Sequence, residues 1–464
     1  MSGQNYFEAV DIRRMMAEYP LGDAFVETFS RMSRDELRAL QNKRFKKIVA
    51  RAWQIPFYQR LWGAQGIEAG DIRGLDDITK LPAFSKTELM KSIEDYPPFG
   101  DFHGLDSFAP GQRPPVVFHT TSGTTGTPQN LFFGPWAREL QNLFMARAYH
   151  VMGLRDDDVV HSVYGHGMIN GGHYIREAFV HFSKALFLSA GTGNETRSAA
   201  QVDLMRRFGV SVIVGFADYI KKLAQVAEDE GLKIGGDIRI RMIISHLGRE
   251  PREAVGGPWQ ADHTYDWYGV GDTGLIAFEG PDLDGMYVME DGHYLEIVDP
   301  ETGAPVADGS EGNMVVSVLF KDDIYPIIRF DTKDVSAYAL GQSSLGLNLR
   351  RLTGFLGRSD NMVKLRGINL YPIAIGALAI EHPAALGEYI CRATRDASGR
   401  EEMTVVVEVD DPANAAVHEE LAAMLKRKLG ISIDVELVAR GETAPFTEID
   451  RRQKAIRLID ERSD

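Results

Sequence analysis

Hydrophobic positions in the middle of the chain fall into short runs that alternate with amphipathic stretches. Strands are predicted between residues 116 and 248 over VVFHT, DVVHSVYG, ALFLSAG, VSVIVGF and RMIISHLG. Helices are predicted over PWARELQNLFMARAYHVMG, QVDLMRRFG and ADYIKKLAQVAEDEG. Strands that alternate with helices favour an α/β fold in which crossover helices connect a largely parallel sheet.

The pattern changes on either side of this region. Residues 35–62 carry apolar positions at helical spacing, and their basic cluster is interpreted as a solvated helix face. Between residues 293 and 320, two alternating strands flank a Pro/Gly turn, which is typical of an antiparallel meander. A Gly-, Asp- and Arg-rich boundary over 354–367 then precedes a compact α+β pattern. It has helices near 372–381 and over AVHEELAAMLKRKLG, and strands over EMTVVVEV and DVELVA.

Length and composition narrow the class of protein. The 464 residues exceed the roughly 250–300 that one core supports, so at least two domains are expected. A net charge of −15, from 51 basic and 66 acidic residues, gives no global reason to bind nucleic acid or an anionic membrane. The charged N-terminus resembles no signal peptide, and the longest apolar runs are too short to span a bilayer. A cytoplasmic protein is expected.

The single cysteine, Cys391, excludes an intrachain disulfide, a CxxC redox pair and a Cys-rich zinc site.

The segment HTTSGTTGTP over residues 119–128 is the most informative segment of the sequence. Its glycines allow backbone N–H groups to form an anion-binding concavity, and its hydroxyls add donors. It follows a predicted strand and runs toward a helix start, where an anion is further favoured. It is not a Walker loop, since the chain contains no Gly-Lys dipeptide. The alternative is a flexible surface loop.

TSGTTGTP resembles the phosphate loop of the adenylate-forming superfamily. IPFYQRLW, LPAFSKTEL, VYGHGMINGG, GREP and LEIVDPETGAPV resemble segments of its phenylacetate–coenzyme A ligase branch, in the same order and over nearly the whole chain. The resemblance implies a large N-terminal adenylation domain over residues 1–359 and a small, mobile C-terminal domain over 360–464. It also implies that ATP, with Mg²⁺, activates an aromatic carboxylic acid to an acyl-adenylate, and that coenzyme A then takes the acyl group. Family members are often dimers, and some carry a zinc site that this chain cannot build.

YDWYGVGDTG, residues 265–274, contains a formal G-x-G-x-x-G dinucleotide motif. That interpretation is rejected because a polar segment precedes it and no amphipathic helix follows it. The resemblance instead implies that Tyr268, with Gly269, stacks on adenine and that Asp272, where the family usually has Glu, helps to hold magnesium. A turn-capping aspartate is the alternative for Asp272. Asp334 is expected to bind the ribose diol, for which a carboxylate is a suitable acceptor.

Further nucleotide and acceptor residues follow from the same resemblance. The expected ATP ligands also include the phosphate-loop residues Thr121, Ser122, Gly123, Thr124, Thr125 and Gly126, together with Gly248, Glu250 and Arg358. Asp360 is expected to be the hinge, and Lys364, Arg366 and Gly367 to face coenzyme A. Lys454 aligns with the family's catalytic lysine through the downstream AIRLIDER, although Gln453 replaces the usual glycine. The alternative for Lys454 is an exposed lysine on a basic terminal helix.

The acid pocket is expected, by position in the family, to be lined by Tyr164, His166, Gly167, Phe216, Ala217 and Asp218. Aromatic walls and a glycine floor suit a flat aryl acid such as an arylacetate or a benzoate. His166 and Asp218 suggest a polar substituent, such as an amino or hydroxyl group; the alternative is that either residue faces away. Two other functions stay open: an enzyme that passes the acyl group to a carrier protein or an amine, and a non-catalytic nucleotide-binding relative.

Overall fold

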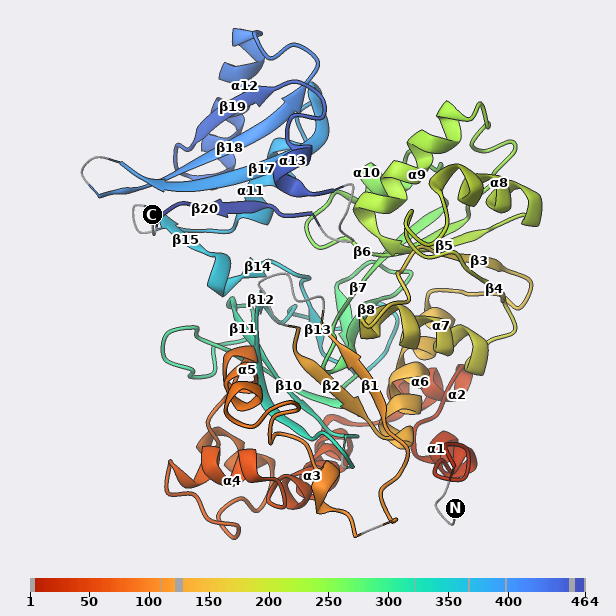
Figure 1. The fold of residues 1–464 in the computed structure, drawn as a ribbon, viewed down its shortest axis with the longest axis vertical. Coiled ribbons are helices and arrows are strands. Elements are labelled where there is room, and N and C mark those ends of the chain that lie inside the picture. The colour runs from red at the N-terminus through yellow and green to blue at the C-terminus, as the bar shows by residue number, and fades with distance from the viewer. Residues whose placement is uncertain are drawn as a thin grey trace. The chain divides into compact units, whose positions relative to one another are not determined.

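The computed structural model describes residues 5–109, 111–121, 128–321, 323–365, 368–396, 399–449 and 455–462, without the side chains of 364, 368 and 369. The chain divides into two compact units (Figure 1). The first unit comprises Met1–Gly191 and Tyr265–Gly354, and the second comprises Thr192–Thr264 and Phe355–Asp464. In this division residues 192–264 group with the C-terminal segment, whereas the sequence predicted one N-terminal domain over 1–359. The domain border near residue 360 stays a prediction.

The N-terminal part of the first unit is helical. Its helices are α1 (Ile12–Glu18), α2 (Asp23–Arg31), α3 (Arg34–Ala52), α4 (Pro56–Gly63) and α5 (Lys86–Asp95). The helical pattern predicted over 35–62 is therefore two helices. The break falls before Pro56, because the residue preceding a proline is disfavoured in the α conformation and proline itself suits a first helical turn. Among the described residues, no helix combines the length and apolar character needed to cross a bilayer.

A short hairpin in the first unit frames the predicted phosphate loop. Strand β1 (Val117–Thr120) pairs antiparallel with β2 (Asn130–Phe133), so that Thr120 faces Asn130. The loop between them leads into β2, and helix α6 (Pro135–Val151) begins only afterwards. A strand therefore stands between the loop and the helix start toward which the sequence predicted that the loop runs. The four buried residues of β2 complete the hairpin before Pro135 opens the helix.

The remaining strands of the first unit carry its predicted site residues. Strand β3 (Val159–Ser162) runs parallel to β4 (Leu186–Ser189) and is connected to it by helix α7 (Asn170–Phe182). Strands β7 (His263–Val270), β8 (Gly274–Glu279), β9 (Met286–Val288) and β13 (Arg351–Leu352) are antiparallel neighbours. A strand thus precedes GVGDTG, contrary to the polar segment expected there. A second strand rather than a helix follows it, which agrees with rejecting the dinucleotide motif.

The predicted meander is confirmed. Strands β10 (His293–Val298), β11 (Gly312–Val318) and β12 (Ile327–Ser336) pair antiparallel in chain order. Nearly all their side chains are buried. This meander carries Asp334 close to the end of β12.

The second unit begins with an α/β segment. Strand β5 (Val212–Phe216) runs parallel to β6 (Met242–His246), and helices α8 (Ser198–Phe208), α9 (Ala217–Asp229) and α10 (Arg252–Gly256) accompany them. Phe216 ends β5 and is also the N-cap residue of α9, so Asp218 lies in the first helical turn. This strand-to-helix step fixes where the predicted pocket segment 216–218 stands.

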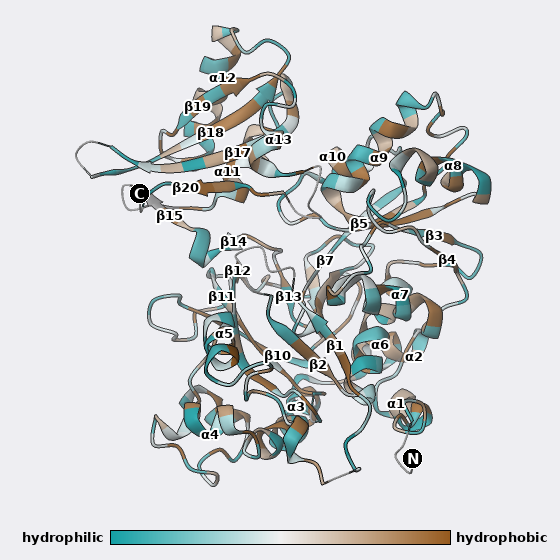
Figure 2. Ribbon diagram, viewed as in Figure 1, coloured by the Kyte–Doolittle hydropathy of each residue, from teal (hydrophilic) through white to brown (hydrophobic). Residues whose placement is uncertain are grey.

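The C-terminal part of the second unit is the predicted α+β pattern. Its elements are β14 (Gly357–Arg358), β15 (Val363–Leu365), β16 (Ile368–Leu370), α11 (Pro372–Ala379), β17 (Ala385–Arg395), β18 (Glu401–Val409), α12 (Ala415–Leu429), β19 (Asp434–Val438), α13 (Ala444–Thr447) and β20 (Leu458–Asp460). Four strands form a sheet in the order β19-β18-β17-β20. Strand β18 is largely hydrophobic (Figure 2), and its inner side packs with Cys391 of β17 in a closed core. The sequence missed β20, which pairs parallel with β17.

Candidate active site

Two predicted nucleotide residues meet in the first unit. Tyr268 on β7 donates a hydrogen bond from its hydroxyl to Asp334 Oδ2 on β12, at 2.7 Å. Both side chains are buried, with 6% of each residue exposed. The Asp334 backbone N–H in turn donates to Thr332 Oγ1 at 3.1 Å. Segments 66 residues apart are thus joined through the two side chains expected at adenine and ribose. Their roles toward a nucleotide stay predictions.

Asp272 lies on the turn between β7 and β8 and is almost fully buried. Its Oδ1 accepts hydrogen bonds from Gln129 Nε2 at 2.5 Å and from the Tyr325 hydroxyl at 2.8 Å. Burial raises the pKa of Asp272 above its ordinary value, although these hydrogen bonds and the nearby charge of Lys321 oppose the shift. Both of these side-chain hydrogen bonds go to Oδ1.

Gln129 connects Asp272 to the predicted phosphate loop. The backbone N–H of Thr121 donates to the Gln129 carbonyl at 3.0 Å, and the Gln129 N–H donates to Thr121 Oγ1 at 3.1 Å. The two ends of the loop are thereby closed, while the Gln129 side chain reaches Asp272. Ser122, Gly123, Thr124, Thr125 and Gly126 lie outside the described residues, so their binding role stays a prediction. The sequence did not single out Gln129.

Lys321 is another residue that sequence reasoning missed. Its side chain is completely buried, and Nζ donates to the main-chain carbonyl of Asp272 at 3.0 Å. The ammonium lies over the rings of Tyr325 and Phe133, at 4.1 and 4.6 Å from their centroids. Burial lowers the pKa of Lys321 to about 7. A lysine followed by two aspartates is typical of a solvated loop, so the sequence offered no signal for it.

Two residues of the predicted acid pocket, His166 and Gly167, lie at a chain of three histidines, His166, His173 and His119, whose neighbouring ring centres are 5.8 and 4.5 Å apart. His166 Nε2 lies 2.8 Å from Ser189 Oγ, and the His173 Nε2 lies 2.7 Å from the Gly167 carbonyl. The His173 ring stacks on that of His119 at 4.5 Å. Burial lowers the pKa of His119 to about 4, so it is neutral near pH 7. Tyr164 is also buried, and it lies two residues after the end of β3. Ser189, His173 and His119 were not expected.

The other predicted pocket residues belong to the second unit. Phe216 stacks on His246 at 5.3 Å, and Ala217 is buried. The Asp218 carboxylate lies 3.1 Å from Arg457 and 3.3 Å from Lys221. Two cations therefore hold this carboxylate, which leaves it poorly suited to recognise a substituent on the acid. The placement of Asp218 in the acid pocket stays a prediction.

The remaining predicted residues also fall in the second unit. Gly248 has a φ of 60°, a backbone conformation that favours glycine. Glu250 forms an ion pair with Lys221, with 3.0 Å between Oε2 and Nζ. Arg358 and the predicted hinge residue Asp360 form a two-pronged pair, with contacts of 2.8 and 2.6 Å. The Lys364 side chain, Arg366, Gly367 and the catalytic-lysine candidate Lys454 lie outside the described residues.

The donor set at Asp272 fits a magnesium ion that is shared with phosphates. Mg²⁺ is commonly held by one or two carboxylates while substrate phosphates and water fill the remaining positions. A single buried carboxylate whose two side-chain donors share one oxygen meets that need. Elsewhere in the described ranges, no group of three or more His, Cys, Asp or Glu side chains is arranged to hold a metal ion.

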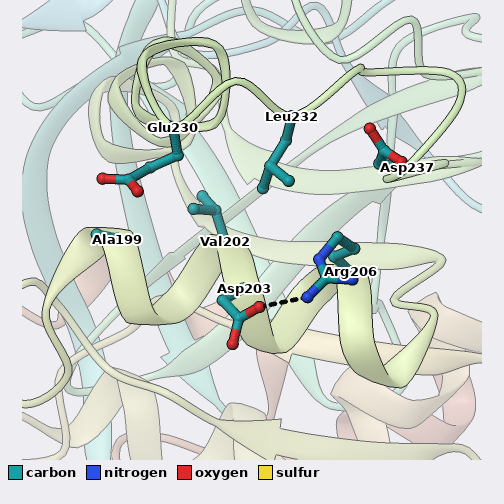
Figure 3. Close-up of a pocket in the computed structure, with 7 residues that line it drawn as sticks. All are labelled: Ala199, Val202, Asp203, Arg206, Glu230, Leu232 and Asp237. Carbon is teal, nitrogen blue, oxygen red and sulfur yellow. Dashed lines mark hydrogen bonds and ion pairs between the residues drawn. The ribbon is translucent and has the colours of Figure 1, made fainter.

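A separate surface pocket lies on the second unit (Figure 3). It is lined by Ala199, Val202, Asp203, Arg206, Glu230, Leu232 and Asp237. Arg206, its one basic lining residue, is paired with Asp203 at 2.8 Å. The lining is acidic overall and contains none of the predicted site residues, so it does not suit an anionic nucleotide.

Comparison with known proteins places these residues in context. The family model of the AMP-binding enzyme C-terminal domain matches residues 367–462. The chain is 30% identical to a phenylacetate–coenzyme A ligase of Escherichia coli, covering 92% of this chain and 96% of that protein. It is 29% identical to the ligase of the same name from Aromatoleum evansii, over 87% and 89% of the two chains. A crystal structure of 2-hydroxyisobutyryl-CoA ligase superposes with a TM-score of 0.81 at 24% identity, covering 94% and 92%.

Proposed function

This chain belongs to the phenylacetate–coenzyme A ligase family of adenylate-forming enzymes, and from that membership we propose that it activates an aromatic carboxylic acid with ATP and transfers it to coenzyme A. In the first step a carboxylate oxygen attacks the α-phosphorus of ATP, and pyrophosphate leaves. In the second step the thiolate of coenzyme A attacks the acyl carbon, and AMP leaves. The products are an aryl-CoA thioester, AMP and pyrophosphate.

The connection between Thr121, Gln129 and Asp272 is the observation that carries the proposal. A carboxylate is a poor electrophile and repels a triphosphate, so adenylation requires positive groups where charge develops. The hydrogen bonds tie Thr121, at the end of the predicted phosphate loop, to a carboxylate suited to a shared metal ion. When bound there, Mg²⁺ would neutralise phosphate charge. Asp272 would hold it, and Lys321 would fix the turn on which Asp272 stands.

The Tyr268–Asp334 pair supports a nucleoside site beside this phosphate site. Tyr268 and Asp272 stand on the same β7–β8 hairpin, so a nucleotide that spans both would lie along one structural element. In this proposal Asp334 exchanges its hydrogen bond from Tyr268 for those of the ribose hydroxyls. The tyrosine ring is then free to lie against adenine.

The acid would bind beside the histidine chain of the first unit. Tyr164 is buried and Gly167 has no side chain, while the His166–Ser189 pair would offer a polar group to an amino or hydroxyl substituent. We propose Lys454 as the lysine that meets the α-phosphate during adenylation. The C-terminal segment would then rotate about Asp360, and Lys364, Arg366 and Gly367 would meet coenzyme A.

Acid-dependent pyrophosphate release tests this function. The protein is assayed with ATP, Mg²⁺ and a panel of arylacetates and amino- or hydroxybenzoates, with and without coenzyme A. We expect release with at least one substituted aryl acid and faster turnover when coenzyme A is present. Release that coenzyme A does not accelerate would indicate another acceptor, such as a carrier protein or an amine. ATP binding without release for any acid would contradict catalysis.

A further inference from the structure

Five charged side chains of the second unit form one connected cluster, called here the charged cluster. Asp218, Lys221 and Glu250 come from the segment 192–264, while Glu388 and Arg457 come from the C-terminal segment. Lys221 Nζ reaches both Asp218 at 3.3 Å and Glu250 at 3.0 Å. Arg457 uses one nitrogen for Asp218 at 3.1 Å and the other for Glu388 at 2.7 Å. The guanidinium therefore bridges the two segments.

Arg457 is held firmly on its own side of the bridge. It donates to the Tyr389 carbonyl at 2.9 Å, and its guanidinium lies 4.5 Å from the centre of the Tyr389 ring. Its own carbonyl accepts from the Cys391 N–H at 3.0 Å, immediately before β20 joins β17. A movement of the C-terminal sheet must therefore carry Arg457 with it. The pair with Asp218 is the contact that such a movement would break.

The charges of the cluster depend on one another because they are largely removed from water. Side-chain exposure is 10% for Arg457, 16% for Asp218 and 18% for Lys221. Burial alone would raise the pKa of Asp218, but Arg457 and Lys221 hold it below its ordinary value. Three carboxylates share two cations, so removal of Arg457 would leave three largely buried carboxylates with Lys221 as their one cation in the cluster. The Arg457–Asp218 pair therefore forms only when the segment 192–264 and the C-terminal segment are in contact.

Residues of the charged cluster lie next to predicted site residues in the sequence. Asp218 directly follows Phe216 and Ala217 of the predicted acid pocket, and Glu250 belongs to the GREP segment. Arg457 stands three residues after Lys454. One ion pair thus joins the segments that are proposed to carry the acid, the nucleotide and the catalytic lysine.

We propose that Arg457 is a positioning residue for adenylation, and that its ion pair with Asp218 holds the lysine-bearing segment in place while the acyl-adenylate forms. The inference rests on the proposed function. Adenylation is sensitive to the position of a cation at the α-phosphate, since a misplacement of about 1 Å can cost roughly a hundredfold in rate. In the proposed function, thiol attack on the finished acyl-adenylate does not use Lys454. Loss of the pair should therefore slow the first half-reaction selectively.

The test measures the two half-reactions of the full chain separately. Pyrophosphate release reports adenylation, and thioester formation from supplied acyl-adenylate and coenzyme A reports transfer. We expect Arg457→Met to lower adenylation by roughly a hundredfold, as Lys454→Ala should, and to change transfer by less than about threefold. Arg457→Lys should recover only part of the loss, since one ammonium cannot reproduce the forked contacts to Asp218 and Glu388.

Arg462→Met is the matched control. Arg462 belongs to the same C-terminal segment and pairs with Asp460 and Glu401, away from residue 218. It should leave both half-reactions near parental rates.

Three outcomes would overturn the inference. They are an equal fall of both half-reactions in Arg457→Met, parental adenylation in that variant, or adenylation in Arg457→Lys no higher than in Arg457→Met although its thermal unfolding midpoint matches the parent. A parent that releases no pyrophosphate with any acid would instead defeat the proposed function. The two failures are therefore distinguishable.

Discussion

The nucleotide residues of the first unit and the charged cluster of the second unit are both buried polar groups, but they are held differently. Around Asp272, two neutral side chains donate to the carboxylate, and Lys321 donates to the main-chain carbonyl of the same residue. Around Asp218, ion pairs join separate segments of the chain. The first arrangement suits a site that keeps its shape, because its hydrogen bonds lie within one packed framework. The second suits contacts that form in one state and break in another.

Removal of the Asp272 charge should have the largest effect on the rigid site. Asp272→Asn keeps the shape but loses the anion that the proposed magnesium ion requires, so adenylation should fall by roughly 10²- to 10³-fold. Asp272→Glu, which restores the usual family residue, should retain far more activity. The measurement is pyrophosphate release against Mg²⁺ concentration, with the binding of Mg·ATP measured by calorimetry. Parental Mg²⁺ dependence in Asp272→Asn would remove this residue from the metal site.

Lys321→Met tests whether the buried ammonium orients the Asp272 turn. Methionine fills most of the lysine volume but cannot donate to the Asp272 carbonyl. We expect adenylation to fall by roughly ten- to a hundredfold, with weaker Mg·ATP binding, while transfer from supplied acyl-adenylate stays close to parental. The Tyr325→Phe variant is the matched comparison, because it removes one hydrogen bond to the carboxylate and keeps the ring under Lys321. Equal losses in both half-reactions of Lys321→Met would point to a purely structural lysine.

Two adjacent glycines at the start of α7 differ in the space that surrounds them. A Cβ at Gly172 would collide with the carbonyl oxygen of Gly165, whereas one at Gly171 would meet open space. Gly172→Ala should therefore destabilise the protein by about 1–3 kcal/mol and raise the KM for the acid, because it displaces the backbone beside His166. Gly171→Ala should leave stability unchanged or raise it by up to about 1 kcal/mol. Thermal unfolding and acid saturation curves check both, and equal behaviour of the two variants would contradict the predicted crowding.

The smallest effect is expected at a partly exposed ion pair of the first unit. His181 Nδ1 lies 2.9 Å from Glu139 Oε2, and this hydrogen bond raises the pKa of His181 above its ordinary value. The pair's stabilisation should be fully present below about pH 6.5 and should fade as pH rises through the higher folded-state value. Unfolding midpoints of the parent and His181→Gln should thus differ near pH 6 and converge at higher pH. His150→Gln, which alters an exposed pair with Asp23, should show little difference; a constant offset for His181→Gln would contradict the titration.

The sequence predicted the segments of the site better than the bonds that join them. Tyr268 and Asp334 could be named because each stands in a recognisable string, and the structure brings their side chains together. Gln129 and Lys321 could not, because their importance lies in contacts across 143 and 49 residues. Local patterns describe a residue's neighbours along the chain, and neither residue looks unusual among them.

The differences between the predicted and the observed secondary structure also have local causes. The helical pattern over 35–62 continues through Pro56 when apolar positions alone are counted, but proline forces the break after α3. The phosphate loop leads into β2 because four buried residues are enough for a hairpin strand. Strand β20 is only three residues long and is recognised only once β17 is there to pair with it.

Product stoichiometry is the most direct test of the central claim. The parent protein is incubated with ATP, Mg²⁺, coenzyme A and the most active aryl acid, and the nucleotides and thioester are quantified by chromatography and mass spectrometry. The account predicts one AMP and one pyrophosphate for each aryl-CoA formed, with a transient acyl-adenylate when coenzyme A is omitted. Formation of ADP and phosphate, or consumption of ATP without any thioester, would contradict it.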